Sequence, residues 1–302
     1  MAIKCFAPAK INLSLLVGAP NRKVGAKFGF HPLYSLVGFS RNLGDDLRFE
    51  QSSDLRLSIF GEFSGGLEND TLRSEDNLII KAARLLQNHC GIASGADIIL
   101  TKNLPIASGL GGGSADAAAT LLALTQLWDV TISSLELSKI AEKLGSDVAA
   151  CLQNMPLIMS GYGEKIQEAP KFPDIPILLA NPLIVCPTRA IYGEYDRQNA
   201  FAMPDADYIG CNNIAELAQM LRQFPNSLEA AAFSLHPQIA ALMHELSSLA
   251  GQKLVRISGS GASCFAIFET IEDAQSATAE LQQIYARMNQ KIWARTSIIE
   301  GN

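Results

Sequence analysis

Three consecutive glycines stand in the stretch Leu104-Pro-Ile-Ala-Ser-Gly-Leu-Gly-Gly-Gly-Ser-Ala-Asp-Ala-Ala-Ala119, and nowhere else in the sequence. A short apolar run typical of a strand precedes the stretch, and an alanine-rich segment typical of a helix ends it. Glycine permits positive φ angles and a close approach of the backbone to a ligand. The amides of such a loop and of the helix start then point at an anion. A flexible loop before an ordinary helix is the alternative, but the position of the glycines favours phosphate binding.

Two common phosphate-binding motifs do not fit this stretch. No Gly-Lys-Ser/Thr follows the glycines, so the loop is not a Walker A motif. A dinucleotide-binding Gly-x-Gly-x-x-Gly belongs early in a βαβ unit, and this loop lies about a third of the way along the chain.

Outward from the loop, the sequence mixes strand and helix patterns without strict alternation, which predicts an α+β fold. Strands are expected within 3–60, one of them over 11–17, with turns at Asp45-Asp46 and 52–54. Further strands are expected at 96–100, 157–159, 163–167, 177–180, 253–257, 264–268 and 292–296. Helices are expected at 77–89, 133–144, 214–223, 226–235, 238–249 and 271–288. We expect Asp76 to cap the first helix, Gly91 to end it, and Ser133 with Glu136 to form a capping box. Asp147 is expected in a short polar turn after the second of these helices.

Three prolines close together, Pro170, Pro173 and Pro176, suggest a domain boundary. We therefore predict an N-terminal domain over 1–168 and a C-terminal domain over 169–302. A chain of 302 residues can hold two ordinary domains, and 48% hydrophobic residues with a mean hydropathy of +0.15 can fill a sizeable core. A disordered or fibrous protein is excluded.

The charge balance argues against polyanionic partners. With 24 basic and 30 acidic residues the formal net charge is −6, so neither nucleic acid nor an anionic membrane is an expected partner. A small anion in a locally positive site is not excluded. The six cysteines and four histidines form no Cys-x-x-Cys or His-x-x-x-His pattern, so no protein-bound metal site is predicted. No signal-peptide pattern or long apolar run is present, and we expect a cytoplasmic protein.

Residues Pro105 to Ala119 resemble the nucleotide-binding loop of the GHMP kinase superfamily, whose members transfer a phosphoryl group from ATP to the hydroxyl of a small molecule. Two further stretches resemble that superfamily's first and third motifs, Pro8-Ala-Lys-Ile-Asn-Leu13 and Arg256-Ile-Ser-Gly-Ser-Gly-Ala-Ser263. The resemblance implies a two-lobed fold with a ribosomal-protein-S5-like N-terminal lobe and a ferredoxin-like C-terminal lobe. It also implies an active site in the cleft between the lobes.

Within the superfamily, the ordered motifs resemble one branch, whose acceptor is methylerythritol linked to cytidine diphosphate, an intermediate of non-mevalonate isoprenoid synthesis. These motifs are 10–13, 29–31, 76–78, 111–116, 145–148 and 258–261. The chain departs from the branch at Phe28-Gly-Phe-His-Pro-Leu33, where the family usually has Asp-Gly-Tyr-His. Phe30 keeps the aromatic face but lacks the phenol, and stacking on a base needs only the face.

The resemblance assigns roles to individual residues. Asp147 would accept or orient the hydroxyl proton of the acceptor, and Lys10 would pair with Asp147 and offset charge on the transferred phosphate. The implied nucleotide-binding residues are Asn77, Lys102, Pro105, Ser108, Gly109, Leu110, Gly111, Gly112, Gly113, Ser114 and Ala115. The first two match positions that line the adenine pocket of the family. The implied substrate-binding residues are Asn12, Phe30, His31, Asp147, Thr188, Gly259 and Ser260. Phe30 and His31 would stack on and hydrogen-bond the cytosine ring. ATP and Mg²⁺ are the implied cofactors, and no residue is assigned as a magnesium ligand.

Without the resemblance, several of these residues have ordinary structural interpretations. Lys10 is then a solvated strand end, Asp147 a turn residue, and Gly259 to Gly261 a hairpin turn. Other acceptors, namely homoserine, mevalonate or phosphomevalonate, are a second hypothesis, and a non-catalytic ligand sensor on the same fold is a third. We expect a small-molecule substrate, no nucleic acid or membrane partner, and a monomer or weak homodimer.

Overall fold

The computed structural model describes residues 2–23, 28–66, 76–201, 203 and 207–302. Backbone contacts divide the chain into two compact units, each made of separate segments. Unit 1 comprises Met1–Lys10, Leu43–Ile106 and Gly111–Asn154, and unit 2 comprises Ile11–Asn42, Ala107–Leu110 and Met155–Asn302. The expected α+β fold is confirmed, while the domain boundary at 168/169 stays a prediction.

Unit 1 contains a sheet in which β5 lies between β4 and β3, and β1 also pairs with β3. The strands are β1 (Ala2–Asn12), β3 (Leu33–Ser52), β4 (Leu55–Phe60) and β5 (Gly95–Thr101). β5 runs antiparallel to the second half of β3 and parallel to β4. Alternate side chains of these strands, such as Leu47, Phe49 and Ile98, are buried, as expected for a sheet with one covered face.

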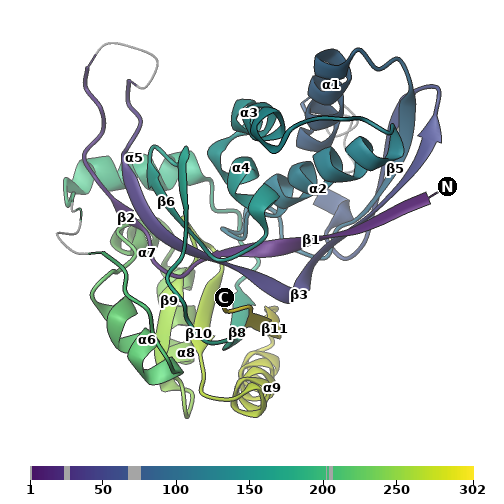
Figure 1. The fold of residues 1–302 in the computed structure, drawn as a ribbon. Coiled ribbons are helices and arrows are strands. Elements are labelled where there is room, and N and C mark those ends of the chain that lie inside the picture. Colours follow the sequence, from purple (N-terminus) through teal and green to yellow (C-terminus); the bar gives the residue numbers. More distant parts are fainter. Residues whose placement is uncertain (1, 24–27, 67–75, 202, 204–206) are drawn as a thin grey trace. The chain divides into compact units, whose positions relative to one another are not determined.

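In the described part of unit 1, four α-helices and a short 3₁₀ helix accompany the sheet; Figure 1 labels the α-helices. They are η1 (Ser64–Gly66), α1 (Leu78–Cys90), α2 (Gly112–Leu127), α3 (Ser134–Leu144) and α4 (Ser146–Gln153). α2 is rich in alanine and leucine, buries most of its residues and contacts both α1 and α4. The capping box of Ser133 and Glu136 and the left-handed cap at Gly91 are both confirmed.

Unit 2 is built on the strand order β3-β11-β8-β10-β9. β2 and β6 pair with the first half of β3, and β7 pairs with β6. Its further strands are β2 (Leu16–Val17), β6 (Leu157–Gly161), β7 (Lys165–Glu168), β8 (Ile175–Asn181), β9 (Leu254–Ile257), β10 (Cys264–Ile267) and β11 (Trp293–Ile299). β8 is buried along its whole length, because it is central in the sheet. Its apolar run, rather than an alternating pattern, is typical of such a strand.

Among its described residues, unit 2 has five helices, and side chains of α5, α7, α8 and α9 fill a common apolar core with the strands. They are α5 (Thr188–Gln198), α6 (Ile214–Arg222), α7 (Glu229–Leu235), α8 (Pro237–Ser248) and α9 (Ile271–Arg287). Tyr195, Phe268 and Leu281 are among the fully buried core residues. The helix expected at 271–288 ends one residue earlier than predicted, and the one expected at 226–235 begins three residues later.

Four local expectations from the sequence were wrong. Asp45 and Asp46 lie inside β3 rather than in a turn, because Asp45 is buried and bonded by polar groups from elsewhere in unit 1. Asn77, not Asp76, caps α1, with its side-chain oxygen accepting from the amide of Ile79 at 2.8 Å. Asp147 lies in the first turn of α4 rather than in a turn between elements. The strand pattern over 11–17 is interrupted, since β1 ends at Asn12 and β2 begins at Leu16.

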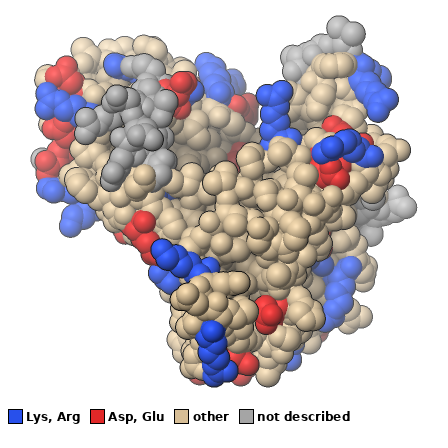
Figure 2. Space-filling model, turned by 180° about the vertical axis from the view of Figure 1, so that it is seen from behind, with Lys and Arg blue, Asp and Glu red and all other residues tan. Residues whose placement is uncertain are grey.

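The described residues include no helix that is long and apolar enough to cross a bilayer. On the face drawn in Figure 2, the Lys and Arg side chains stand singly or beside Asp and Glu, and the described part of that face carries no broad basic patch. All six cysteines are free thiols, four of them buried.

Candidate functional site

Lys10 and Asp147 form an ion pair in unit 1. Lys10 Nζ lies 2.8 Å from Asp147 Oδ1, and the lysine side chain is only 5% exposed whereas the aspartate side chain is 42% exposed. Asp147 stands in the first turn of α4, where a carboxylate is favoured by the helix dipole. The structure thus brings together the two residues to which catalysis was assigned: the cation is buried and the carboxylate remains accessible.

The glycines at the start of α2 pack directly on two lysine side chains of unit 1. A Cβ atom on Gly111 would lie 3.0 Å from Lys10 Cβ, and one on Gly112 would lie 2.9 Å from Lys102 Nζ. Gly111 also has a φ of +62°. Gly111 therefore requires glycine for its conformation, and a larger residue at Gly112 would displace the Lys102 ammonium group.

Among the described residues, no side chain caps the amide donors at the start of α2. Gly111 is its N-cap and supplies no side-chain hydrogen bond, and the amide of Ala115 is the first to bond back, to the Gly111 carbonyl at 2.8 Å. The amides of Gly112, Gly113 and Ser114 consequently have no partner within the helix. This is the local geometry that the sequence predicted for an anion-binding loop.

Lys102 lies beneath this helix start, in a buried cluster with two carboxylates. Its ammonium contacts Asp45, and Nζ lies 2.9 Å from Asp116 Oδ2. Asp45 also accepts from the amides of Asn103 and Leu104, at 2.6 and 2.9 Å. The cluster was not predicted from the sequence, and the contact of Lys102 with adenine stays a prediction, since the ammonium group is turned toward the carboxylates.

One ammonium group cannot balance two buried carboxylates. Burial raises the pKa of Asp116 to about 7, against the opposing effect of Lys102 and with a further increase from the charge of Asp45. Burial opposes the charge of Lys102, but the two carboxylates outweigh it and raise the pKa of the ammonium group. Asp116 Oδ1 is buried without a hydrogen-bond partner among the described residues.

In unit 2, residues 107–110 of the glycine-rich stretch are held on the turn between β9 and β10. Ser258 Oγ donates to the carbonyl of Gly109 at 2.8 Å, and the amide of Ser263 donates to the carbonyl of Ser108 at 2.9 Å. A Cβ atom on Gly109, whose φ is +76°, would lie 2.2 Å from the Ser258 carbonyl oxygen. Position 109 thus needs glycine so that the backbone can pack against the turn of the 256–263 motif.

Asn12 belongs to the same group in unit 2. Its backbone amide donates to Ser258 Oγ at 3.2 Å, and its side-chain Nδ2 donates to Ser35 Oγ at 2.8 Å. Thr188 and Ser260 also meet, with their hydroxyl oxygens 2.9 Å apart. Unit 2 therefore gathers Asn12, Thr188, Gly259 and Ser260, four of the predicted substrate-binding residues, on or beside one turn.

Phe30 and His31, the two residues predicted to bind the base, differ in exposure. The Phe30 side chain is 55% exposed, as a stacking face requires. The His31 ring is buried, with Nδ1 2.8 Å from the Gly18 carbonyl and Nε2 3.2 Å from Asp196 Oδ1. Both ring nitrogens are engaged within unit 2, so the interaction of the ring with cytosine stays a prediction.

Residues near His31 were missed by the sequence reasoning. The ring of Tyr192 lies 5.2 Å from that of His31, and Tyr195 and Phe201 lie at 6.1 Å, all measured between ring centres. Asp196 and these aromatic residues follow Thr188 in the sequence by a few positions. The signal that could have found them was the helix that begins at that threonine, which carries two tyrosines and two acidic residues.

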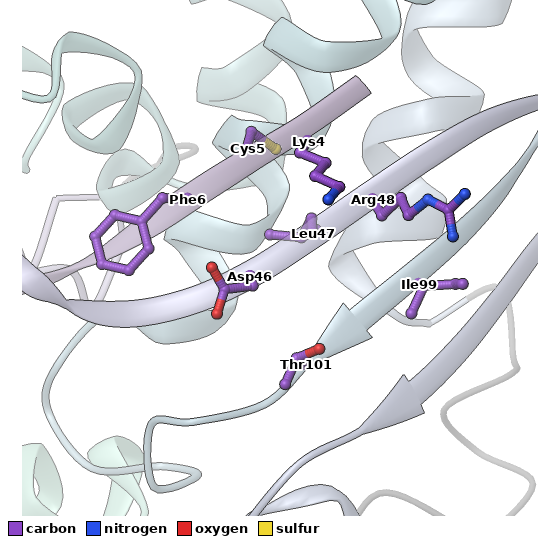
Figure 3. Close-up of a pocket in the computed structure, with 8 residues that line it drawn as sticks. All are labelled: Lys4, Cys5, Phe6, Asp46, Leu47, Arg48, Ile99 and Thr101. Atoms are coloured by element: carbon purple, nitrogen blue, oxygen red, sulfur yellow. The ribbon is translucent and has the colours of Figure 1, made fainter. Parts of the chain in front are cut away.

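A separate surface pocket of about 580 Å³ lies on unit 1 (Figure 3). Residues of β1, β3 and β5 line it, among them Lys4, Phe6, Arg48 and Ile99. It contains none of the predicted site residues, and burial raises the pKa of Cys5 in its wall to about 12, with smaller effects from Asp116 and Asp46. Nothing in this pocket suggests chemistry.

Comparison with known proteins decides the family. The model of the GHMP kinases N terminal domain matches residues 77–155, and that of the GHMP kinases C terminal matches residues 206–287. The chain is 41% identical over 278 residues to 4-diphosphocytidyl-2-C-methyl-D-erythritol kinase of Parvibaculum lavamentivorans, covering 91% of this chain and 92% of that protein. The chain belongs to the 4-diphosphocytidyl-2-C-methyl-D-erythritol kinase family of the GHMP kinases.

Other relatives agree with this family. The protein of the same description from Chelativorans sp. is 40% identical over 281 residues, covering 92% of this chain and 90% of that protein. A crystal structure of 4-(cytidine 5'-diphospho)-2C-methyl-D-erythritol kinase matches with a TM-score of 0.75 and 29% identity, covering 99% of this chain and 100% of that one. A homoserine kinase from Cytophaga hutchinsonii matches at a TM-score of 0.70 but 22% identity, covering 99% of this chain and 95% of that one, which shows the shared fold alone. The chain is a small-molecule kinase.

Proposed function

We propose that this kinase transfers the γ-phosphoryl group of ATP to the 2-hydroxyl of 4-diphosphocytidyl-2-C-methyl-D-erythritol, in the non-mevalonate pathway of isoprenoid precursors. The observation that carries the chemistry is the pair of Lys10 and Asp147, 2.8 Å apart, with the lysine buried and the carboxylate accessible. The names and extents of the relatives support the acceptor.

Phosphoryl transfer needs mainly alignment and stabilisation of spreading negative charge. Asp147 accepts or orients the proton of the attacking hydroxyl, and Lys10 holds that carboxylate in place through its ion pair. The free amides at the start of α2 bind the nucleotide phosphates. The residues gathered at the β9–β10 turn, Asn12, Thr188 and Ser260 among them, bind the acceptor.

Magnesium would enter with the nucleotide. No group of three His, Cys, Asp or Glu side chains suited to a metal lies among the described residues, and Mg²⁺ commonly relies on substrate phosphates and water for most of its ligands. The described side chains fit a Mg²⁺ ion that would be held chiefly by the nucleotide phosphates, whose negative charge the ion would neutralise. A cytoplasmic location and a monomeric or weakly dimeric state remain predictions.

The function is tested by coupled ADP release with a panel of acceptors: the cytidine diphosphate compound, homoserine, mevalonate and phosphomevalonate. We expect turnover with the first and little with the others. A preference for an acceptor without cytidine would reject the proposed substrate. Nucleotide binding without turnover on any acceptor would favour the ligand-sensor hypothesis.

The role of Asp147 is tested by Asp147→Asn, for which we expect kcat to fall by about 10²- to 10⁴-fold while the affinity for ADP is kept. Asp97→Asn is the matched control, because Asp97 is a comparably exposed carboxylate of unit 1 that lies 4.0 Å from Arg56. Wild-type turnover in Asp147→Asn, or an equal loss in both variants, contradicts the assignment.

A further inference from the structure

A chain of buried hydrogen bonds in unit 2 fixes the side chain of Asn12. Asn12 Nδ2 donates to Ser35 Oγ at 2.8 Å, and Ser35 Oγ donates to the backbone carbonyl of Ser14 at 2.6 Å. Asn12 is 5% exposed, and Ser35 and Ser14 are fully buried. The two serines and the asparagine thus form a continuous, ordered path from β3 to the end of β1.

The proton count of this path decides the orientation of the amide. A serine hydroxyl has one hydrogen to donate, and Ser35 gives it to the Ser14 carbonyl. Ser35 must therefore accept from Asn12, so the NH₂ group of the amide faces Ser35 and the carbonyl oxygen faces away. If the amide were reversed, the Ser35 hydroxyl would have to turn to it and leave the buried Ser14 carbonyl without a donor, which costs free energy.

The carbonyl oxygen so presented points to the glycine turn. Asn12 Oδ1 would lie 3.4 Å from a Cβ atom on Gly259, a position that glycine leaves empty. It accepts no hydrogen bond from the described residues, and it is not one of their fully buried, unpartnered side-chain atoms. Beside Gly259, Asn12 therefore presents an accessible hydrogen-bond acceptor, its carbonyl oxygen, and not a hydrogen-bond donor.

We propose that Ser35 is a positioning residue that fixes the Asn12 amide with its carbonyl oxygen toward the substrate, so that the site selects a hydroxyl of the acceptor there. A substrate group that can only accept hydrogen bonds, such as a phosphate or ether oxygen, would face the lone pairs of Oδ1 and be disfavoured. The inference rests on the proposed function for the identity of the substrate, but the orientation of the amide does not.

The orientation is tested first without any substrate. In ¹⁵N NMR spectra of the wild-type chain, with the Asn12 side-chain signal assigned from Asn12→Ala, we expect one NH₂ proton to exchange slowly with solvent. Ser35→Ala should abolish that protection. Two rapidly exchanging protons in the wild type overturn the inference, whatever the protein phosphorylates.

The kinetic test uses the acceptor that the wild-type enzyme prefers. We expect Ser35→Ala to lower kcat/KM for the acceptor by about 10-fold, the equivalent of one hydrogen bond, with KM for ATP unchanged. Ser35→Cys keeps the volume with a weaker hydrogen-bonding group and should lose activity in the same direction, so the test survives if the alanine variant folds poorly. Ser40→Ala is the matched control, a buried serine of the same strand that bonds Ser297 at 2.6 Å.

A double-mutant cycle separates positioning from a merely structural role. If Ser35 acts through Asn12, then adding Ser35→Ala to Asn12→Ala should cause no further loss in kcat/KM for the acceptor. An undiminished loss in that background, or an equal loss in Ser40→Ala, overturns the inference. A wild-type chain that uses an acceptor without cytidine rejects the proposed substrate only.

Discussion

Replacing Asp116 by asparagine removes a titrating group from the buried cluster of Lys102, Asp45 and Asp116. Asparagine keeps the shape and can still accept from Lys102 Nζ, which lies 2.9 Å from Asp116 Oδ2. It cannot ionise. The variant therefore isolates the free energy associated with the charge of Asp116, and its effect on stability should depend on pH.

The sign follows from the raised pKa. Burial, opposed by Lys102 and helped by Asp45, raises the pKa of Asp116 from 3.8 to about 7 in the folded chain. The folded state therefore holds this proton more tightly than the unfolded state. The stabilisation that protonated Asp116 provides is fully present below pH 3.8 and is lost as pH rises toward 7. Above pH 7 this group causes no further change in the free energy of unfolding. Each pH unit in that interval lowers the free energy of unfolding by about 1.4 kcal/mol, so the interval amounts to about 4 kcal/mol.

The assay is urea unfolding of the wild type and of Asp116→Asn at pH 5 and at pH 8. Between the two pH values, the variant should gain about 3 kcal/mol relative to the wild type, because most of the interval lies between them. Asp97→Asn, which removes an exposed carboxylate from the same unit, should show no such change. A difference independent of pH, or one favouring the wild type at pH 8, would refute the reasoning and mean that the ion pair with Lys102 outweighs burial.

Two further predictions concern the backbone of the loop and the capping of α3. Gly109→Ala should lower the free energy of unfolding by several kcal/mol, because the new Cβ would lie 2.2 Å from the Ser258 carbonyl oxygen, whereas Gly91→Ala, at a similar positive φ but with open space around it, should cost only about 1 kcal/mol; equal losses in urea unfolding would contradict the steric argument. Ser133→Ala should cost about 1 kcal/mol, since it removes the bond to the Glu136 amide at 3.2 Å; an unchanged melting temperature would show that the exposed cap contributes nothing.

Local patterns predicted the helices well, because their signals lie within a few residues of one another. The box of Ser133 and Glu136 and the stop at Gly91 are examples. The cap of α1 was placed one residue early, since Asp76 and Asn77 are adjacent and both types are good caps. Only the backbone geometry, extended at Asn77, separates them.

Long-range pairing is what the sequence did not reveal. An aspartate in a strand pattern is typical of a turn, and Asp45 is kept in β3 by a lysine 57 residues away. The same holds for His31, whose partner Asp196 lies on α5. The resemblance predicted the type of most site residues and one pairing, that of Lys10 with Asp147, but not the partners of Lys102 and His31.

The acidic balance of the chain also gains a physical interpretation. Lys10 is paired with Asp147, and Lys102 with Asp45 and Asp116, so each lysine has a carboxylate partner in unit 1, and the action of Lys10 on the transferred phosphate stays a prediction. What remains at the start of α2 is a set of backbone amides without side-chain caps. Amides carry no net charge, and their donors are fixed in direction by the helix. A protein of net charge −6 can thus bind a small polyanion without a basic face, and the glycines matter because they fix where those amides point.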